Sequence, residues 1–265
     1  MAADARPRVL IVEDEPDMNN LLADILSVYD FEPLRAATGK QALALLDQQN
    51  PDAILLDLML PDFSGIELCK RLKDSRDTRR IPIVILTALD GQVHRRKAYE
   101  AGADDYMTKP FAPEALVARL RACLDQALST PERCRRLDVT IEPTASISDL
   151  KAFNALVTCL RGRTDLDLDR VEALRKGLVR IADAAGQWAA AHDRVPPVRL
   201  TINLESQMLR LTFEPQAAGG DAFLAEHLAD EAAVPAALID AGVIDRVRQV
   251  DSGVVFEKAL APPES

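Results

Sequence analysis

The sequence predicts two domains that both mix helices and strands: a doubly wound parallel sheet of five strands, and then an α+β layer sandwich. Three observations lead to this expectation. The first half alternates short apolar runs with amphipathic helical segments five times. Those runs are nearly all apolar, as is typical of parallel strands covered on both faces. The second half instead places helices beside consecutive pairs of alternating runs, which predict hairpins.

Length and composition bound the class of protein. The chain has 265 residues, enough for one large domain or two ordinary ones, and 48% of them are hydrophobic. Mean hydropathy is −0.05, and no apolar stretch approaches the roughly 20 residues that span a bilayer. The N-terminus also lacks the long apolar segment of a signal peptide. We therefore expect no membrane association and a cytoplasmic location.

Cysteine usage and charge add two expectations. The four cysteines are scattered, without a CxxC pair, and read as reduced thiols: Cys69, Cys123, Cys134 and Cys159. The formal net charge of −10 argues against a broad nucleic-acid surface, because such binding depends on neutralising phosphates. Nucleic acid is therefore an unfavoured partner.

Five strand–helix units fill the first half in order. The expected strands are "RVLIVED" (8–14), "FEPLRAA" (31–37), "DAILLD" (52–57), "IPIVILTA" (81–88) and "DDYMTKPF" (104–111). The expected helices are 15–30, 39–50, a segment through Ile66, Leu68 and Leu72, then 92–103 and 112–128. Asn50 and Pro51 are expected to close the second helix. Each helix shows apolar residues three and four apart.

Polar side chains stand where these strands end. They are Glu13 and Asp14 after the first strand, Asp57 after the third, Thr87 after the fourth and Lys109 after the fifth. Any one of them alone is an ordinary solvated strand terminus. Because ligands of open parallel sheets bind outside the carboxyl ends of the strands, the set predicts one site.

The residue types point to phosphoryl transfer onto Asp57. Three converging carboxylates repel one another, and a divalent cation such as Mg²⁺ relieves that repulsion. A metal also neutralises charge on a phosphoryl group that approaches a carboxylate. Lys109 offers a positive charge for phosphate, and Thr87 offers a hydroxyl donor.

Residues 8 to about 128 resemble the receiver domain of two-component response regulators, which has a flavodoxin-like fold. The match rests on the acid pair Glu13–Asp14, Asp57 in "LLDLMLPDFSGIEL", Thr87 followed by Ala88, and "YMTKPF" with Lys109. The resemblance implies that Asp57 is the phosphoacceptor. It also implies that Asp14, Asp57 and the backbone carbonyl of Met59 hold Mg²⁺, while Glu13 assists through water.

The same resemblance implies a switch and its partners. Thr87 and Tyr106 would move together on phosphorylation and alter the face formed by the fourth helix, fifth strand and fifth helix. A histidine kinase or phosphotransfer protein would supply the phosphate. The Lys109–Pro110 bond is usually cis in this family. The sequence leaves open whether phosphorylation produces a homodimer through that face.

The pattern changes near residue 128. "LSTPERCRR" interrupts the helical period, so we place domain boundaries at 1–128, a linker at 129–135 and a second domain at 136–265. That domain is expected to contain a strand (136–143), a helix (146–160), a longer helix (168–188) and hairpins at 198–215 and 242–260. The hairpins are expected to turn at Glu205–Ser206 and Asp251–Gly253. An alanine-rich, less regular segment separates them.

The order of these elements is similar to the ATP-binding fold shared by histidine kinases and anti-sigma serine kinases. The nucleotide-binding residues of that family do not carry over. Its Glu and Asn on the long helix become Arg180 with Ala184, or Asp183 with Gln187, depending on register. "FEPQAAGG" replaces its Asp-x-Gly motif. We therefore expect a degenerate ATPase-like output domain that binds no ATP, is not an enzyme and contacts an unidentified signalling protein.

Two other interpretations remain for the second half. The domain is an active divergent kinase or phosphotransfer domain, or, less favoured, a DNA-binding transcriptional output. "GGDAF" (219–223) resembles the motif of diguanylate cyclases, but Ala222 stands where an acid is needed. A flexible turn is the expectation for that segment.

Overall fold

The computed structural model describes residues 6–75, 77–127, 136–140, 147–163, 168–192, 198–205, 208–215, 219–229, 232–251 and 253–259. The chain divides into two compact units, Met1–Leu128 and Ser129–Ser265, each of which is considered by itself. The predicted linker, 129–135, lies outside the described residues. Among the helices that are described, none combines the length and the apolar character needed to cross a membrane.

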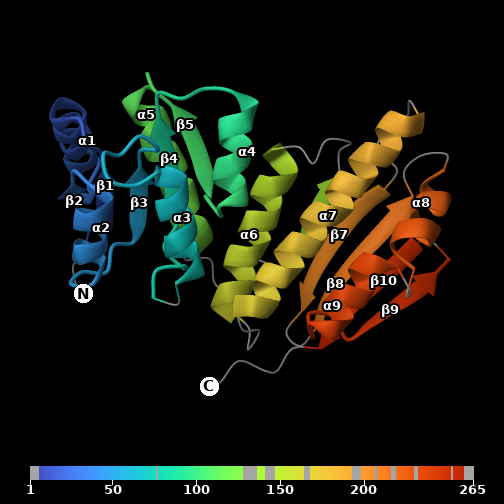
Figure 1. Ribbon diagram of the computed structural model, residues 1–265. Coiled ribbons are helices and arrows are strands. Elements are labelled where there is room, and N and C mark those ends of the chain that lie inside the picture. The colour runs from blue at the N-terminus through green and yellow to red at the C-terminus, as the bar shows by residue number, and fades with distance from the viewer. Residues whose placement is uncertain are drawn as a thin grey trace. The chain divides into compact units, whose positions relative to one another are not determined.

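The first unit is built on a parallel sheet with the strand order β2-β1-β3-β4-β5 (Figure 1). The strands are β1 (Arg8–Val12), β2 (Glu32–Ala36), β3 (Ala53–Leu56), β4 (Ile83–Thr87) and β5 (Asp105–Thr108). Central strands β3 and β4 are buried at every residue, as uninterrupted apolar runs predict. Pro33 lies in β2, which is an edge strand and tolerates the missing donor. The predicted doubly wound sheet is confirmed.

Five helices alternate with these strands. They are α1 (Pro16–Val28), α2 (Gly39–Leu46), α3 (Gly65–Asp74), α4 (Gln92–Glu100) and α5 (Pro113–Ala127). The apolar stripes of α1 and α5 pack on one face of the sheet, where Leu26 and Leu120 meet Ile11 and Val84. Helix α2 ends four residues before the expected Asn50, because the amides of Gln48 and Gln49 turn back to the carbonyl of Leu45.

The second unit contains an antiparallel sheet with the strand order β6-β7-β8-β10-β9. Its strands are β6 (Arg136–Thr140), β7 (Val198–Glu205), β8 (Met208–Pro215), β9 (Arg246–Val250) and β10 (Gly253–Ala259). The two predicted hairpins are therefore present as β7–β8 and β9–β10. Ser206 and Ser252, in their expected turns, lie outside the described residues.

Helices α6 (Ile147–Arg163), α7 (Leu168–His192), α8 (Gly220–His227) and α9 (Ala233–Asp240) complete this unit. Their apolar side chains share one core with inward residues of the sheet, such as Leu200, Leu211 and Phe256. The α+β layer arrangement is thus confirmed. The flexible turn expected at 219–223 is wrong: Gly219 has a φ of 97°, and α8 begins at Gly220. Burial of Phe223 and Leu224 stabilises that helix.

Candidate functional site

Four strand ends of the first unit bring the predicted polar residues to one edge of the sheet. Glu13 follows β1, Asp57 follows β3, Thr87 ends β4 and Lys109 follows β5. The backbone fixes these positions, since the Asp57 amide donates to the Val12 carbonyl and the Lys109 amide donates to the Thr87 carbonyl. Parallel strands end on the same side, and the side chains therefore converge.

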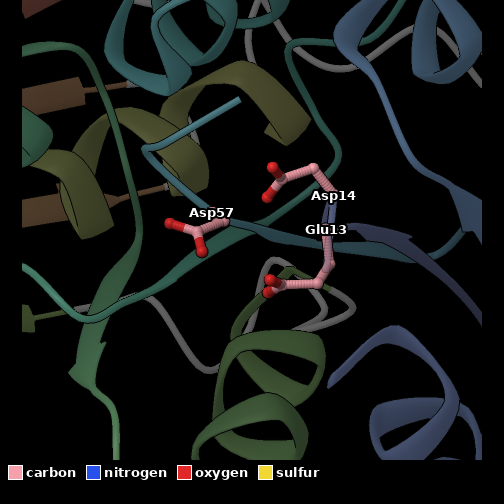
Figure 2. Close-up of side chains that lie close together, drawn as sticks. All are labelled: Glu13, Asp14 and Asp57. Carbon is pink, nitrogen blue, oxygen red and sulfur yellow. The ribbon is translucent and has the colours of Figure 1, made fainter. Parts of the chain in front are cut away.

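The carboxylates of Glu13, Asp14 and Asp57 form one acidic group. Each offers an oxygen, and these oxygens all lie within 4.8 Å of one another. Figure 2 shows Asp14 and Glu13 reaching from one segment and Asp57 from another. Glu13 and Asp57 are buried while Asp14 is exposed, so the group opens to solvent at Asp14. Close carboxylate oxygens with access to water are the ligands that Mg²⁺ prefers.

Lys109 supplies the positive charge of the site. Its Nζ donates to Glu13 Oε2 and to Asp57 Oδ2, both at 2.6 Å. Burial works to lower the pKa of Lys109, but its hydrogen bonds and attraction to the two carboxylates prevail, and that pKa is raised. The Lys109–Pro110 peptide bond is cis. Lys109 is therefore a fixed ammonium beside Asp57.

The environment of Glu13 differs from that of an ordinary surface acid. Burial raises the pKa of Glu13, and the nearby charges of Asp57 and Asp14 raise it further. Lys109 opposes this rise without cancelling it. Three acids and one lysine leave surplus negative charge, which a divalent cation would neutralise. The residues present therefore fit a Mg²⁺ ion.

Thr87 and Tyr106 meet at the backbone of Leu89. Thr87 is fully buried, and its Oγ1 accepts the Leu89 amide at 3.3 Å. The Tyr106 hydroxyl donates to the Leu89 carbonyl at 2.6 Å. The Arg95 guanidinium lies 5.6 Å from the centre of the Tyr106 ring. The loop between β4 and α4 is thus held by both residues that were predicted to switch together.

The sequence interpretation missed Asn19, which fixes the backbone of Glu13. Asn19 is 4% exposed on α1, and its Nδ2 donates to the Glu13 carbonyl at 2.8 Å and to the Ala36 carbonyl at 3.2 Å. Arg35 Nε donates to Asn19 Oδ1 at 2.6 Å. A polar residue on the otherwise apolar face of a helix was the available signal.

Gly65 was also missed, although it determines the backbone next to Asp57. Its amide donates to the Leu58 carbonyl, and Met59 pairs with Ser64 across the same loop. A Cβ at position 65 would lie 2.2 Å from the Asp57 carbonyl oxygen. The Met59 amide donates to Asp57 Oδ1 at 3.1 Å, so the tight loop orients the carboxylate. Coordination by the Met59 carbonyl stays a prediction.

Comparison with protein families identifies the class of this unit. Residues 9–121 match the response regulator receiver domain. The PhoB phosphate regulon transcriptional regulatory protein of Pseudomonas aeruginosa is 47% identical over 116 residues, which are 44% of this chain and 51% of that protein. The DNA-binding dual master transcriptional regulator RpaA of Synechocystis is 38% identical, over 50% of this chain and 55% of that protein.

A solved structure is similar over the same share of the chain. The receiver domain of RstA from Klebsiella pneumoniae, activated by BeF3, is 36% identical and covers 44% of this chain and 97% of its own, with a TM-score of 0.42. The chain spans about half the length of the curated relatives named above.

Proposed function

Because the N-terminal unit is the receiver domain of a response regulator, we propose that Asp57 accepts a phosphoryl group from a histidine kinase and thereby switches protein binding by the second unit. The observation that carries this proposal is the Asp57 carboxylate itself. It lies at a strand end, grouped with Glu13 and Asp14, with Lys109 Nζ 2.6 Å from its Oδ2. A phosphotransfer protein could donate the phosphoryl group in place of the kinase.

In the proposed step an Asp57 carboxylate oxygen forms a bond to phosphorus while the bond from phosphorus to the donor histidine nitrogen breaks. A Mg²⁺ ion held by Asp14 and Asp57, with Glu13 beside it, would neutralise charge on the phosphoryl oxygens. Lys109 already contacts Asp57 and can move its ammonium to a phosphoryl oxygen. Thr87 can turn its hydroxyl from the Leu89 amide toward the same group.

The new phosphate brings nearly two negative charges next to this network. If Thr87 leaves the Leu89 amide, the β4–α4 loop loses that contact, and the Leu89 carbonyl keeps its hydrogen bond from Tyr106. The proposed switch is therefore a shift of this loop, which borders α4 and β5. Its consequence is altered exposure of the output unit to a downstream signalling protein.

We further propose that the output unit is a degenerate ATPase-like domain without enzymatic activity. Its support is the element order and the antiparallel sheet β6-β7-β8-β10-β9. On α7, where that family has Glu and Asn, this chain has Arg180 with Ala184 or Asp183 with Gln187, and neither pair keeps those residue types. An active kinase or phosphotransfer domain is the alternative. Mg-dependent ATP binding by the full chain, measured by calorimetry, would favour that alternative.

DNA-binding output is a second candidate, because the similar PhoB and RpaA proteins are transcriptional regulators. The net charge of −10 opposes it. Salt-dependent binding of duplex DNA by the full chain would establish it in place of protein binding.

The proposal for Asp57 is tested by labelling the full chain with radioactive acetyl phosphate in the presence of Mg²⁺. We expect Asp57→Asn to abolish the label, since the amide keeps the shape but is no nucleophile. Asp24→Asn, which changes an exposed acid on α1, is the matched control and should label as the wild type does. Persistent labelling of Asp57→Asn would refute the assignment.

A further inference from the structure

The sheet of the second unit has an outward face that its own helices do not share. Residues Leu200, Leu211, Phe213, Val254 and Phe256 point into the core with α6 to α9. Because side chains alternate along a strand, their neighbours point to the opposite face. The described outward positions include Arg199, Thr201, Asn203, Arg210, Thr212, Glu214, Arg246, Arg248, Val255 and Glu257.

Glu257 lies at the centre of an arginine cluster on this face, formed by Arg210, Arg246 and Arg248. Its Oε1 accepts from Arg210 Nε at 3.0 Å and from Arg248 Nη2 at 2.9 Å, and its Oε2 accepts from Arg246 Nε at 2.6 Å. The strand register places Arg210 and Arg246 directly opposite Glu257 on either side. The Glu257 carboxylate is 2% exposed beneath the guanidinium groups.

Three arginines of the cluster share the single carboxylate of Glu257. Glu257 supplies one negative charge to three guanidinium groups, which repel one another. The side chains of Arg246 and Arg248 are 60% and 51% exposed. Each uses one nitrogen on Glu257, and a guanidinium has five N–H donors. An external anion would relieve the repulsion between the guanidinium groups and would accept hydrogen bonds from their remaining N–H groups.

The outward side chains that the structure describes carry a net positive charge. The ionisable ones among them are four arginines and two glutamates, whereas the chain as a whole has a net charge of −10. The described outward positions include no aromatic side chain, and stacking of nucleic-acid bases on this face is therefore unsupported. Arginine forks match carboxylates in a bidentate geometry.

We propose that this arginine cluster is a docking surface for an acidic segment of a partner protein, bound through its Asp and Glu side chains. The inference rests on the proposed role of the second unit in protein binding, and it names the chemistry of the partner. The Glu257 carboxylate holds the three guanidinium groups together in advance, which lowers the entropy lost when a partner binds.

The test uses the full unphosphorylated chain and a fluorescent peptide with glutamate at alternate positions, followed by anisotropy. A peptide with glutamine at those positions is the control ligand. We expect the glutamate peptide alone to bind, and added salt to weaken it. Arg246→Gln with Arg248→Gln should weaken binding at least about tenfold. Arg180→Gln, an exposed arginine of α7, should bind as the wild type does.

Arg246→Lys with Arg248→Lys keeps the charge and should retain part of the binding. Fluorescence of Trp188, the single tryptophan, checks that each variant is folded. Equal binding of both peptides, wild-type binding by the glutamine double variant, or binding of duplex DNA in place of the peptide would each overturn the proposal. Because the protein is unphosphorylated, these outcomes are independent of labelling at Asp57.

Discussion

Lys109 Nζ lies 2.6 Å from Asp57 Oδ2, and this contact joins the end of β5 to the end of β3. The same nitrogen reaches Glu13, and it therefore compensates two buried carboxylates at once. Removal of the ammonium leaves both acids without their cation. The following changes separate what such contacts contribute to stability from what they contribute to phosphorylation.

Lys109→Gln should lower the free energy of unfolding of the receiver by about 3 kcal/mol. The substitution leaves the buried carboxylates of Glu13 and Asp57 without their positively charged partner. It should also slow labelling by acetyl phosphate. The three tyrosines, all in the first unit, report its unfolding in urea by fluorescence. Lys70→Gln changes an exposed lysine on α3 and should alter neither quantity. Unchanged stability of Lys109→Gln would show that the contact is energetically neutral.

Asn19→Ala should destabilise the receiver by about 2 kcal/mol, because the carbonyls of Glu13 and Ala36 lose a buried donor. It should weaken Mg²⁺ binding as well, since Glu13 and Asp14 lose their backbone anchor. The measurement is Mg²⁺ titration by calorimetry beside urea unfolding. Asn20→Ala, at the exposed neighbouring position, is the control. Equal Mg²⁺ affinity in both variants would show that Asn19 does not support Mg²⁺ binding.

Gly65→Ala should lower stability by at least about 2 kcal/mol and reduce labelling of Asp57, because the added Cβ meets backbone atoms that cannot rotate away. Hydrogen exchange at the amides of β3 and its following loop should increase. Ser64→Ala provides the neighbouring control, since the Ser64 side chain makes no capping bond to α3. Normal labelling of Gly65→Ala would show that the loop relaxes freely.

Glu257→Gln should destabilise the second unit by about 2 kcal/mol near neutral pH, because three charged hydrogen bonds weaken. Although burial alone would raise it, the pKa of Glu257 is held below its ordinary 4.5 by the hydrogen bonds from Arg210, Arg246 and Arg248. A lowered folded pKa means stability that is present above pH 4.5 and lost as the pH falls through the folded value.

The measurement for Glu257 is thermal unfolding, followed by Trp188 fluorescence, at pH values from neutral down to below 4.5. The difference in Tm between wild type and Glu257→Gln should be largest above pH 4.5 and shrink toward acid. A difference that is independent of pH would mean that the carboxylate charge is not what stabilises the sheet. Glu214→Gln, on the same face, is the matched control variant.

The site residues of the first unit were predictable because each can be located in the sequence from the end of a strand. Four of the five strands end in, or are followed by, a polar residue, and parallel strands bring such ends to one edge. Asn19 and Gly65 were not predictable in the same way, because their partners are backbone groups whose positions depend on loop geometry. The helix at 220–227 was missed because its stability comes from burial of Phe223 and Leu224 against distant strands.

By itself the sequence determined the parallel sheet, the residue types of the acidic site and the hairpins of the second unit, since these depend on local period and on strand ends. Only the tertiary structure decided that Lys109 bridges Glu13 and Asp57, and that three arginines gather on Glu257. Those contacts join residues far apart in the chain or on separate strands. Strand register and packing bring these residues together, and their pairing cannot be predicted from the local sequence pattern.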